Sequence, residues 1–229
     1  AEKFYGLGTM RLGIEKSRNL MTVRLADKIG MEAILKTAED FNLKKGLDNN
    51  LSMALGAGGV TLRDLTNAYA MVVNGGKKIK PNLIQSIYDR RGKLIFTSEE
   101  KKCLNCIQFG DLIEYELPKI EEKEEFVIDR KVAYQMTSML EGVIQRGTGK
   151  KIATLKIPLA GKTGTTNDNK DAWFIGFSPD LVVGVYVGYD HPKSLGYKET
   201  GSKVAVPIFK EFMKKALFKK NKIPFRIPS

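Results

Sequence analysis

Apolar residues recur about every three to four positions over the first third of the chain, a spacing that predicts helices. One such run covers residues 20–29 and a second covers residues 31–41, with a glycine between them that indicates a break. Thr61, with Asp64 three residues on, forms a capping signature for another helix, which a pair of glycines then ends. We therefore expect an all-helical lobe over residues 1–76.

The pattern changes after this lobe. Apolar residues on both sides of the turn signal at residues 89–92 predict a β-hairpin. The polar stretch over residues 97–126 predicts a loop, and it carries Cys103 and Cys106. We expect residues 77–128 to form this hairpin and polar excursion.

The last part, residues 129–229, is predicted to contain a helix and then strands. Asp129 is the expected N-cap. The apolar side of its helix is predicted to hold Val132, Met136, Met139, Leu140 and Val143. Strands are predicted at residues 155–165, 172–177 and 181–189, and the last two are apolar on both faces, as central strands covered by helices are.

A C-terminal helix is predicted from Pro207 to Phe218. Its buried side is expected to hold Ile208, Phe209, Phe212, Met213, Ala216 and Leu217. Helices first, then a hairpin, a helix, strands and a final helix predict an α+β fold with an antiparallel sheet.

Composition bounds the class of protein. The 229 residues are 42% hydrophobic, enough for a packed core, and the longest apolar stretch is far short of the roughly 18 residues that a membrane span needs. The formal net charge of +12 suits a nucleic-acid binder. However, the lysine clusters are short and spread, with no aromatic platform among them. An anionic polymer or a membrane surface fits the charge equally well, and we expect no nucleic-acid partner.

The two cysteines do not predict a metal site. Cys103 and Cys106 would need two further zinc ligands, and the chain has one histidine, His191, and no third cysteine. In an oxidising compartment this pair favours a small loop disulfide, with two ordinary thiols as the alternative. We expect no metal and no cofactor.

The segment from Gly161 to Thr166 carries the most specific chemistry. A nucleotide-binding loop would need glycine where Lys156 stands and a helix directly afterwards, and a hairpin is predicted there instead. The other interpretation is a Lys-Thr-Gly edge strand of a serine acyl-transfer site. The site residues predicted on this strand are Lys162, which places positive charge beside a serine, and the substrate-binding Thr163, Gly164, Thr165 and Thr166.

Such a site needs a hydroxyl and an amide from the helical lobe, and Ser17 and Asn19 supply them within one Ser-x-Asn triplet. Taken singly, Ser17 could merely cap the next helix, and Lys162 could lie on a plain strand. The two motifs together, in this order and on these elements, favour a site.

These motifs resemble the transpeptidase domain of class A, bifunctional penicillin-binding proteins of the 1A type. The resemblance covers most of the chain and is carried by Ser-Arg-Asn at 17–19, residues 55–62, Gly-Thr-Gly at 147–149, residues 161–166 and Asp-Ala-Trp-Phe at 171–174. It implies the fold shared with serine β-lactamases, a five-stranded antiparallel sheet packed between helices beside an all-helical lobe. A cysteine pair after a hairpin also resembles some members.

The resemblance implies an acyl transfer that cross-links peptidoglycan stem peptides and that β-lactams block. A serine attacks the penultimate D-alanine, expels the terminal one and passes the acyl group to an amine. By this resemblance Ser17 relays protons and Asn19 holds the network and the substrate amide. Lys162, Thr163 and Thr165 bind the carboxylate, with the Thr165 N–H in the oxyanion hole.

One family motif is missing. The Ser-x-x-Lys that carries the nucleophile should precede Ser17, and nothing there forms it. Ser98 and Lys101 have the spacing, but they lie between the other two motifs among charged residues, where the lysine would stay solvated and protonated. Because the first residue is also not Met, we expect a fragment without its nucleophile, inactive alone. The missing N-terminal segment, the glycosyltransferase domain and the membrane anchor are expected partners at the periplasmic face of the inner membrane.

Two alternatives remain. A class A β-lactamase would add a deacylating glutamate. The spacing Glu-x-x-x-Asn occurs at Glu15 and Asn19, which is on the wrong side of the Ser-x-Asn motif, so no candidate base for hydrolysis is found. The chain could instead be a non-catalytic fragment of this fold, from a split or decayed gene.

Overall fold

The structure, a computed structural model, describes residues 6–43, 46–98, 103–104, 119–120, 124–219 and 222–228. It divides into two units. Unit 1 comprises Ala1–Lys77 and Phe126–Ser229, and unit 2 comprises Lys78–Glu125.

Unit 1 begins with helices, as the sequence predicts. The glycine between the second and third, Gly30, has φ +90°, a backbone conformation that side chains rarely adopt. Thr61 caps the fourth, because its Oγ1 accepts a hydrogen bond from Asp64 N at 3.1 Å. The elements are α1 (Met10–Glu15), α2 (Asn19–Ile29), α3 (Met31–Asp40), the 3₁₀ helix η1 (Leu51–Leu55) and α4 (Leu62–Val73).

The sheet of unit 1 is antiparallel, with the order β5-β6-β7. Its strands are β5 (Ala160–Thr165), β6 (Ala172–Phe177) and β7 (Val182–Val187). Among the described strands β6 is central and β7 is an edge, so the expectation that both are central is wrong for β7. This sheet has three strands in the described part of the chain, not the five that the resemblance implied.

The strand predicted from residue 155 begins later. Residues Lys150–Leu155 form a 3₁₀ helix, η2, and Lys156 after it has φ +53°. A left-handed residue ends the helical turn and redirects the chain, so extended pairing starts only at Ala160.

Helix α5 (Arg130–Gln145) begins at its predicted cap. Asp129 Oδ1 accepts hydrogen bonds from Lys131 N at 2.7 Å and Val132 N at 3.3 Å. Val132 itself is 50% exposed, so its predicted burial is wrong. The helix presents a neighbouring line of positions to the core, which includes Ala133, Thr137, Leu140 and Ile144.

Helix α6 (Ala205–Ala216) begins two residues before Pro207, which lies in the first turn, where its missing N–H breaks no helical bond. The predicted burial of Ile208 and Phe212 is wrong, since each is 49% exposed. The buried face consists of Ala205, Val206, Phe209 and Met213.

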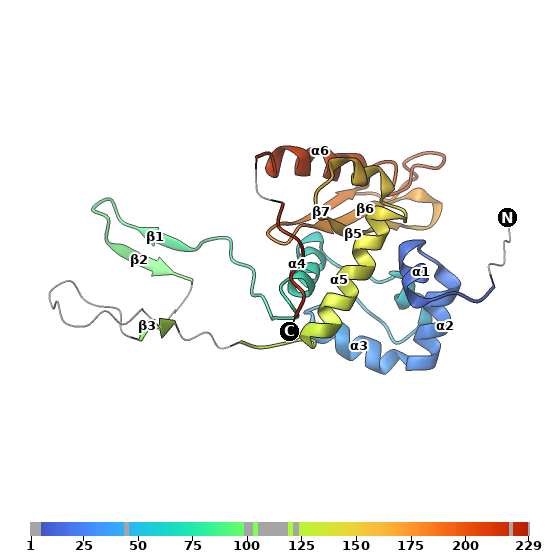
Figure 1. The fold of residues 1–229 in the computed structure, drawn as a ribbon, viewed down its shortest axis with the longest axis horizontal. Helices are drawn as coiled ribbons and strands as arrows, with labels where there is room; N and C mark the ends of the chain where they lie inside the picture. Colours follow the sequence, from blue (N-terminus) through green and yellow to red (C-terminus); the bar gives the residue numbers. More distant parts are fainter. Residues whose placement is uncertain are drawn as a thin grey trace. The chain divides into compact units, whose positions relative to one another are not determined.

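Helices cover both faces of the sheet (Figure 1). Phe174 of β6 packs with α6 and η2 on one face, edge-on to Phe209. Phe177, on the opposite face of the same strand, packs against Leu140 of α5 and Tyr69 of α4. The alternation of side chains along β6 therefore builds two apolar layers, and α5 fixes the sheet to the helical lobe.

Unit 2 contains the predicted hairpin, β1 (Ser86–Tyr88) paired with β2 (Leu94–Thr97). Asp89 closes its turn by accepting from Lys93 N. The following stretch is not loop throughout, because β3 (Cys103–Leu104) pairs with β4 (Lys119–Ile120). Cys106 lies outside the described residues, and the predicted disulfide with it.

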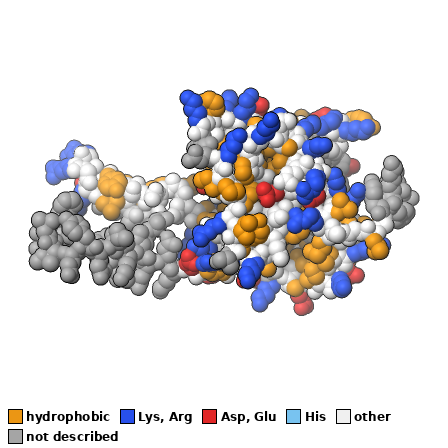
Figure 2. All heavy atoms as spheres, in the orientation of Figure 1, with side chains coloured by type: hydrophobic (Ala, Val, Ile, Leu, Met, Phe, Trp, Pro, Cys, Tyr) orange, Lys and Arg blue, Asp and Glu red, His pale blue; other side chains and the backbone are white. Residues whose placement is uncertain are grey.

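Basic side chains are spread over the face shown in Figure 2, between acidic and apolar groups, without forming one continuous patch. Among the helices that the structure describes, none combines the length and the apolar character needed to cross a membrane.

Candidate active site

Ser17 lies in the turn between α1 and α2, with φ +52°. Arg18 N donates to Gly13 O at 2.8 Å and Ser17 N donates to Ile14 O at 3.2 Å. This is the Schellman pattern that ends helices, and its left-handed position usually holds glycine. A serine there is strained, and strain of this kind is typical of functional positions. The capping alternative is not observed, because the residue that caps α2 is Arg18 and Ser17 Oγ bonds elsewhere.

Lys162 of β5 reaches that serine. Its Nζ donates to Ser17 Oγ at 2.8 Å and to Thr163 O at 3.0 Å. Burial lowers the pKa of Lys162 from 10.5 to about 8. The structure thus brings together the two motifs that the sequence predicts to share a site.

The threonines of the strand already have protein partners. Thr163 Oγ1 lies 2.7 Å from Thr148 Oγ1, and Thr165 Oγ1 accepts from Gly201 N at 3.0 Å. Thr166 Oγ1 accepts from Asp171 N at 2.8 Å. The Thr165 and Thr166 hydroxyls accept, so each still has its own hydrogen to donate, and Thr163 keeps its hydrogen when Thr148 is the donor of their shared bond. These contacts are compatible with the predicted binding of a substrate carboxylate.

Gly164 and Asn19 differ from the simple expectation. A Cβ added at Gly164 would lie 3.0 Å from Trp173 Cβ, so this glycine also serves the contact between β5 and β6. Asn19 is the exposed first residue of α2. Within the described residues no hydrogen bond joins its side chain to Ser17 or Lys162. Its role in the network stays a prediction.

Comparison with known proteins shows the family of the chain. The family described as penicillin-binding protein transpeptidase domain matches residues 2–214. The chain belongs to this transpeptidase family. The resemblance inferred from the motifs is confirmed.

Relatives of the family's 1A type match nearly the whole chain. Penicillin-binding protein 1A of Rickettsia conorii is 44% identical over 227 residues, which cover 99% of this chain and 29% of the relative. The protein of the same name from Pseudomonas aeruginosa is 36% identical over 244 residues, covering 93% of this chain and 30% of the relative. The chain thus spans less than a third of the length of these relatives.

Solved structures confirm the transpeptidase fold. Penicillin-binding protein 1A from Haemophilus influenzae superimposes with a TM-score of 0.84 at 28% identity, over 99% of this chain and 37% of that one. PonA1 from Mycobacterium tuberculosis gives a TM-score of 0.78 at 24% identity, over all of this chain and 61% of that one, and supports the fold alone.

Ser98, which has the Ser-x-x-Lys spacing but is not expected to be the nucleophile, belongs to unit 2. Its N donates to Gln85 O at 2.9 Å and its Oγ accepts from Asn82 Nδ2 at 3.2 Å. Lys101 lies outside the described residues. Among those that are described, no group of three or more His, Cys, Asp or Glu side chains could hold a metal ion.

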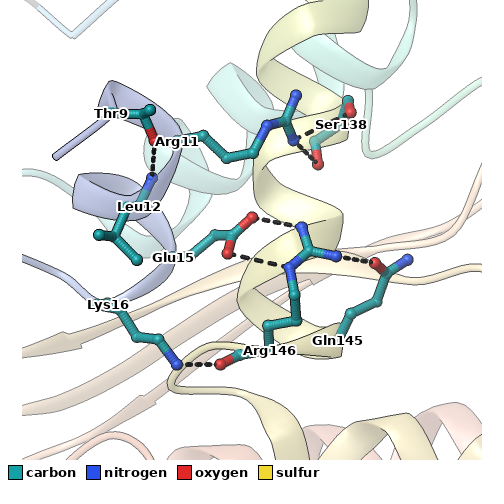
Figure 3. Close-up of polar contacts among 8 residues, drawn as sticks. All are labelled: Thr9, Arg11, Leu12, Glu15, Lys16, Ser138, Gln145 and Arg146. Atoms are coloured by element: carbon teal, nitrogen blue, oxygen red, sulfur yellow. Dashed lines mark hydrogen bonds and ion pairs between the residues drawn. The ribbon is translucent and has the colours of Figure 1, made fainter.

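Sequence reasoning considered Glu15 only as a deacylating base and missed its pairing with Arg146, beside the site. The Glu15 carboxylate is buried at the end of α1 and faces the Arg146 guanidinium at the end of α5 (Figure 3). Charged residues ordinarily lie on the surface. These two are distant in the sequence, and no local sequence pattern indicates that they pair.

Proposed function

We propose that this chain is the part of a peptidoglycan D,D-transpeptidase domain that binds the stem peptide and moves the proton. The hydrogen bond from Lys162 Nζ to Ser17 Oγ is the single observation that carries this proposal. It joins a hydroxyl and an amine that lie far apart in the sequence. The amine is partly buried, which lowers its pKa as serine acyl transfer requires of a lysine at its site.

The direction of this bond defines what Ser17 can do. Because Lys162 donates to Ser17 Oγ, the Ser17 hydroxyl keeps its own hydrogen for another acceptor. When a serine nucleophile attacks the penultimate D-alanine carbonyl, the bond to the terminal D-alanine nitrogen breaks and that nitrogen needs a proton. In this proposal Ser17 donates that proton and recovers one from the network, which is general acid catalysis.

Lys162 also supplies charge for the substrate. With a pKa of about 8, about nine-tenths of it is protonated at pH 7. The ammonium, together with the hydroxyls of Thr163, Thr165 and Thr166, can hold the terminal carboxylate of the stem peptide or of a β-lactam. In the described part of the chain β5 is an edge strand, and an extended peptide can pair along such an edge.

The nucleophile is proposed to come from outside these 229 residues. The only Ser-x-x-Lys within them is the one at Ser98 and Lys101, between the two site motifs. The completed protein would then also carry the glycosyltransferase domain and the anchor, and would act in the bacterial envelope at the periplasmic face of the inner membrane. On its own, this chain would form no covalent adduct.

Labelling with a fluorescent penicillin tests the proposal. The protein that joins this chain to its upstream segment should be labelled on a serine outside the chain, as shown by mass spectrometry of the labelled peptide, and the isolated chain should stay unlabelled. In the joined protein, Lys162→Ala should slow labelling at least about 100-fold. Lys215→Ala, which changes an exposed lysine of α6, should leave the labelling rate unchanged. Label on Ser98 would contradict the assignment, and rapid turnover of a chromogenic cephalosporin would indicate a β-lactamase instead.

A further inference from the structure

The ends of helices α1 and α5 are joined by an ion pair with two contacts. Arg146 Nη2 lies 2.5 Å from Glu15 Oε1, and Arg146 Nε donates to Glu15 Oε2 at 3.2 Å (Figure 3). The Glu15 side chain is 5% exposed, and that of Arg146 is 54% exposed. The hydrogen bond from Arg146 to Glu15, with the attraction between them, raises the pKa of Arg146 above its ordinary value. Burying a carboxylate without a hydrogen-bonded cation beside it is costly, so the pair is what makes this burial possible.

The space that Glu15 occupies exists because two positions facing it are glycines. A Cβ added at Gly142 would lie 2.0 Å from Glu15 Oε1, and one added at Gly147 would lie 2.2 Å from Glu15 O. Two glycines of the α5 region thus leave room for the side chain and the backbone of one residue. The Glu15 side of the pair is therefore built into the α1–α5 contact, and the pair is not an incidental surface contact.

Glu15 is also part of a closed ring of contacts around the site. Thr148 N donates to Glu15 O at 3.3 Å, and Thr148 Oγ1 meets Thr163 Oγ1 at 2.7 Å. Lys162, next to Thr163 in β5, donates to Ser17, two residues after Glu15. The position of Ser17 thus depends on where Glu15 is held, because only the strained turn separates them.

We propose that the Glu15–Arg146 ion pair is a positioning element that holds the Ser17 hydroxyl against Lys162. The inference rests on the proposed function, because it gives the pair a role in acyl transfer. Lys16, whose Nζ donates to Arg146 O, adds a second link between the same two helix ends. Small displacements of a reacting group lower rates strongly, so a loosened turn should slow the chemical step rather than drug binding.

A second contact between α1 and α5 serves as a control that distinguishes the positioning of Ser17 from the packing of the two helices. Arg11, one turn earlier on α1, also bonds to α5, through Nη1 to Ser138 O at 3.1 Å (Figure 3). It is not one of the residues that form the ring around Ser17. Arg11→Gln therefore removes an α1–α5 contact and leaves the positioning of Ser17 unchanged. If Glu15 only packs helices, Glu15→Gln and Arg11→Gln should behave alike.

The test uses the protein that joins this chain to its upstream segment. The rate of acylation by penicillin is measured over a range of drug concentrations and of pH values, at a temperature below the melting temperature of every variant. We expect Glu15→Gln to lower the limiting acylation rate at least about tenfold, with the apparent drug dissociation constant within about twofold. The inflection of the rate near pH 8 should move upward, because water reaching Lys162 reduces the effect of burial. Arg146→Lys, which keeps a cation beside the carboxylate, should give an intermediate rate and does not depend on Glu15→Gln folding.

Equal losses in Glu15→Gln and Arg11→Gln, or an unchanged limiting rate and pH profile in Glu15→Gln and Arg146→Lys, would overturn the inference and leave the proposed function standing. A wild-type protein that penicillin does not label would overturn the proposed function, and the inference with it.

Discussion

Lys162 Nζ lies 2.8 Å from Ser17 Oγ, although 145 positions separate the two residues in the sequence. One belongs to the edge strand β5 and the other to the turn after α1. Burial of the Lys162 amine and the left-handed backbone of Ser17 each lower the stability of the folded chain when taken alone. Their occurrence at one contact is the usual sign of a site where function opposes stability.

The burial of Lys162 predicts that stability depends on pH in a defined window. Below about pH 8 the lysine is protonated in both the folded and the unfolded chain. Between about 8 and 10.5 the folded chain has lost the proton while the unfolded chain still binds it, so the free energy of unfolding rises with pH. Relative to Lys162→Met, the wild-type chain should gain about 3 kcal/mol across this window. Urea unfolding of both chains at several pH values measures the gain.

Lys215→Met, on the exposed side of α6, is the control for that comparison. It should follow the wild-type chain at every pH. Parallel curves for the wild-type chain and Lys162→Met would contradict the lowered pKa of Lys162.

Ser17 offers a matched pair of substitutions that separates backbone strain from chemistry. Both Ser17→Ala and Ser17→Gly lose the hydroxyl that accepts from Lys162. Glycine tolerates φ +52°, so Ser17→Gly should be more stable than Ser17→Ala by about 1 kcal/mol. In the joined protein both should acylate at least about 100-fold more slowly than wild type. Urea unfolding measures the difference in stability, and penicillin labelling measures the rate of acylation. A Ser17→Gly protein that is labelled at the wild-type rate would exclude the hydroxyl from the reaction.

Local signals predicted the elements, and contacts between segments decided the rest. The caps at Thr61 and Asp129 could be predicted because a cap depends on residues within one turn. The prediction that Val132 and Phe212 are buried was wrong. Which side of a helix is buried depends on the elements that pack against it, and the periodicity of apolar residues alone does not fix that side.

The same distinction applies to the site. Ser17 and Lys162 could be predicted to meet because each lies in a motif and the two motifs resemble one family. Glu15 and Arg146 could not, because an ion pair between two distant segments leaves no local pattern. The glycines at 142 and 147 are the nearest sequence signal, and their meaning becomes clear only beside Glu15.

Thr165 is expected to hold the segment after β7 in place as well as substrate. Its Oγ1 accepts from Gly201 N at 3.0 Å. Thr165→Val removes the acceptor with little change in shape and should lower the free energy of unfolding by about 1 kcal/mol, whereas Thr165→Ser should keep it. Slower hydrogen exchange of the Gly201 amide in Thr165→Ser than in Thr165→Val is the direct measurement. Equal exchange in both variants would show that the hydroxyl does not hold this amide.

Gly142 and Gly147 should respond differently to alanine because different atoms of Glu15 oppose them. In a helix, Gly142→Ala alone would gain about 1 kcal/mol from propensity, but its Cβ would meet Glu15 Oε1 at 2.0 Å, and overpacking of about 1–3 kcal/mol should prevail. Glu15→Ala removes the two nearest opposing atoms. The third, Arg146 Nη2 at 2.8 Å, ends a flexible side chain that has lost Glu15 as its partner and can move, so Gly142→Ala should cease to be destabilising in that background.

At Gly147 the nearest atoms are backbone, Glu15 O at 2.2 Å and Val143 Cα at 2.7 Å. No side-chain substitution removes them, so Gly147→Ala should stay destabilising in both backgrounds. Double-mutant cycles from urea unfolding should therefore give a coupling energy for Glu15 with Gly142 and a value near zero for Glu15 with Gly147. Similar coupling at both glycines would mean that the Glu15 side chain does not occupy the space beside Gly142.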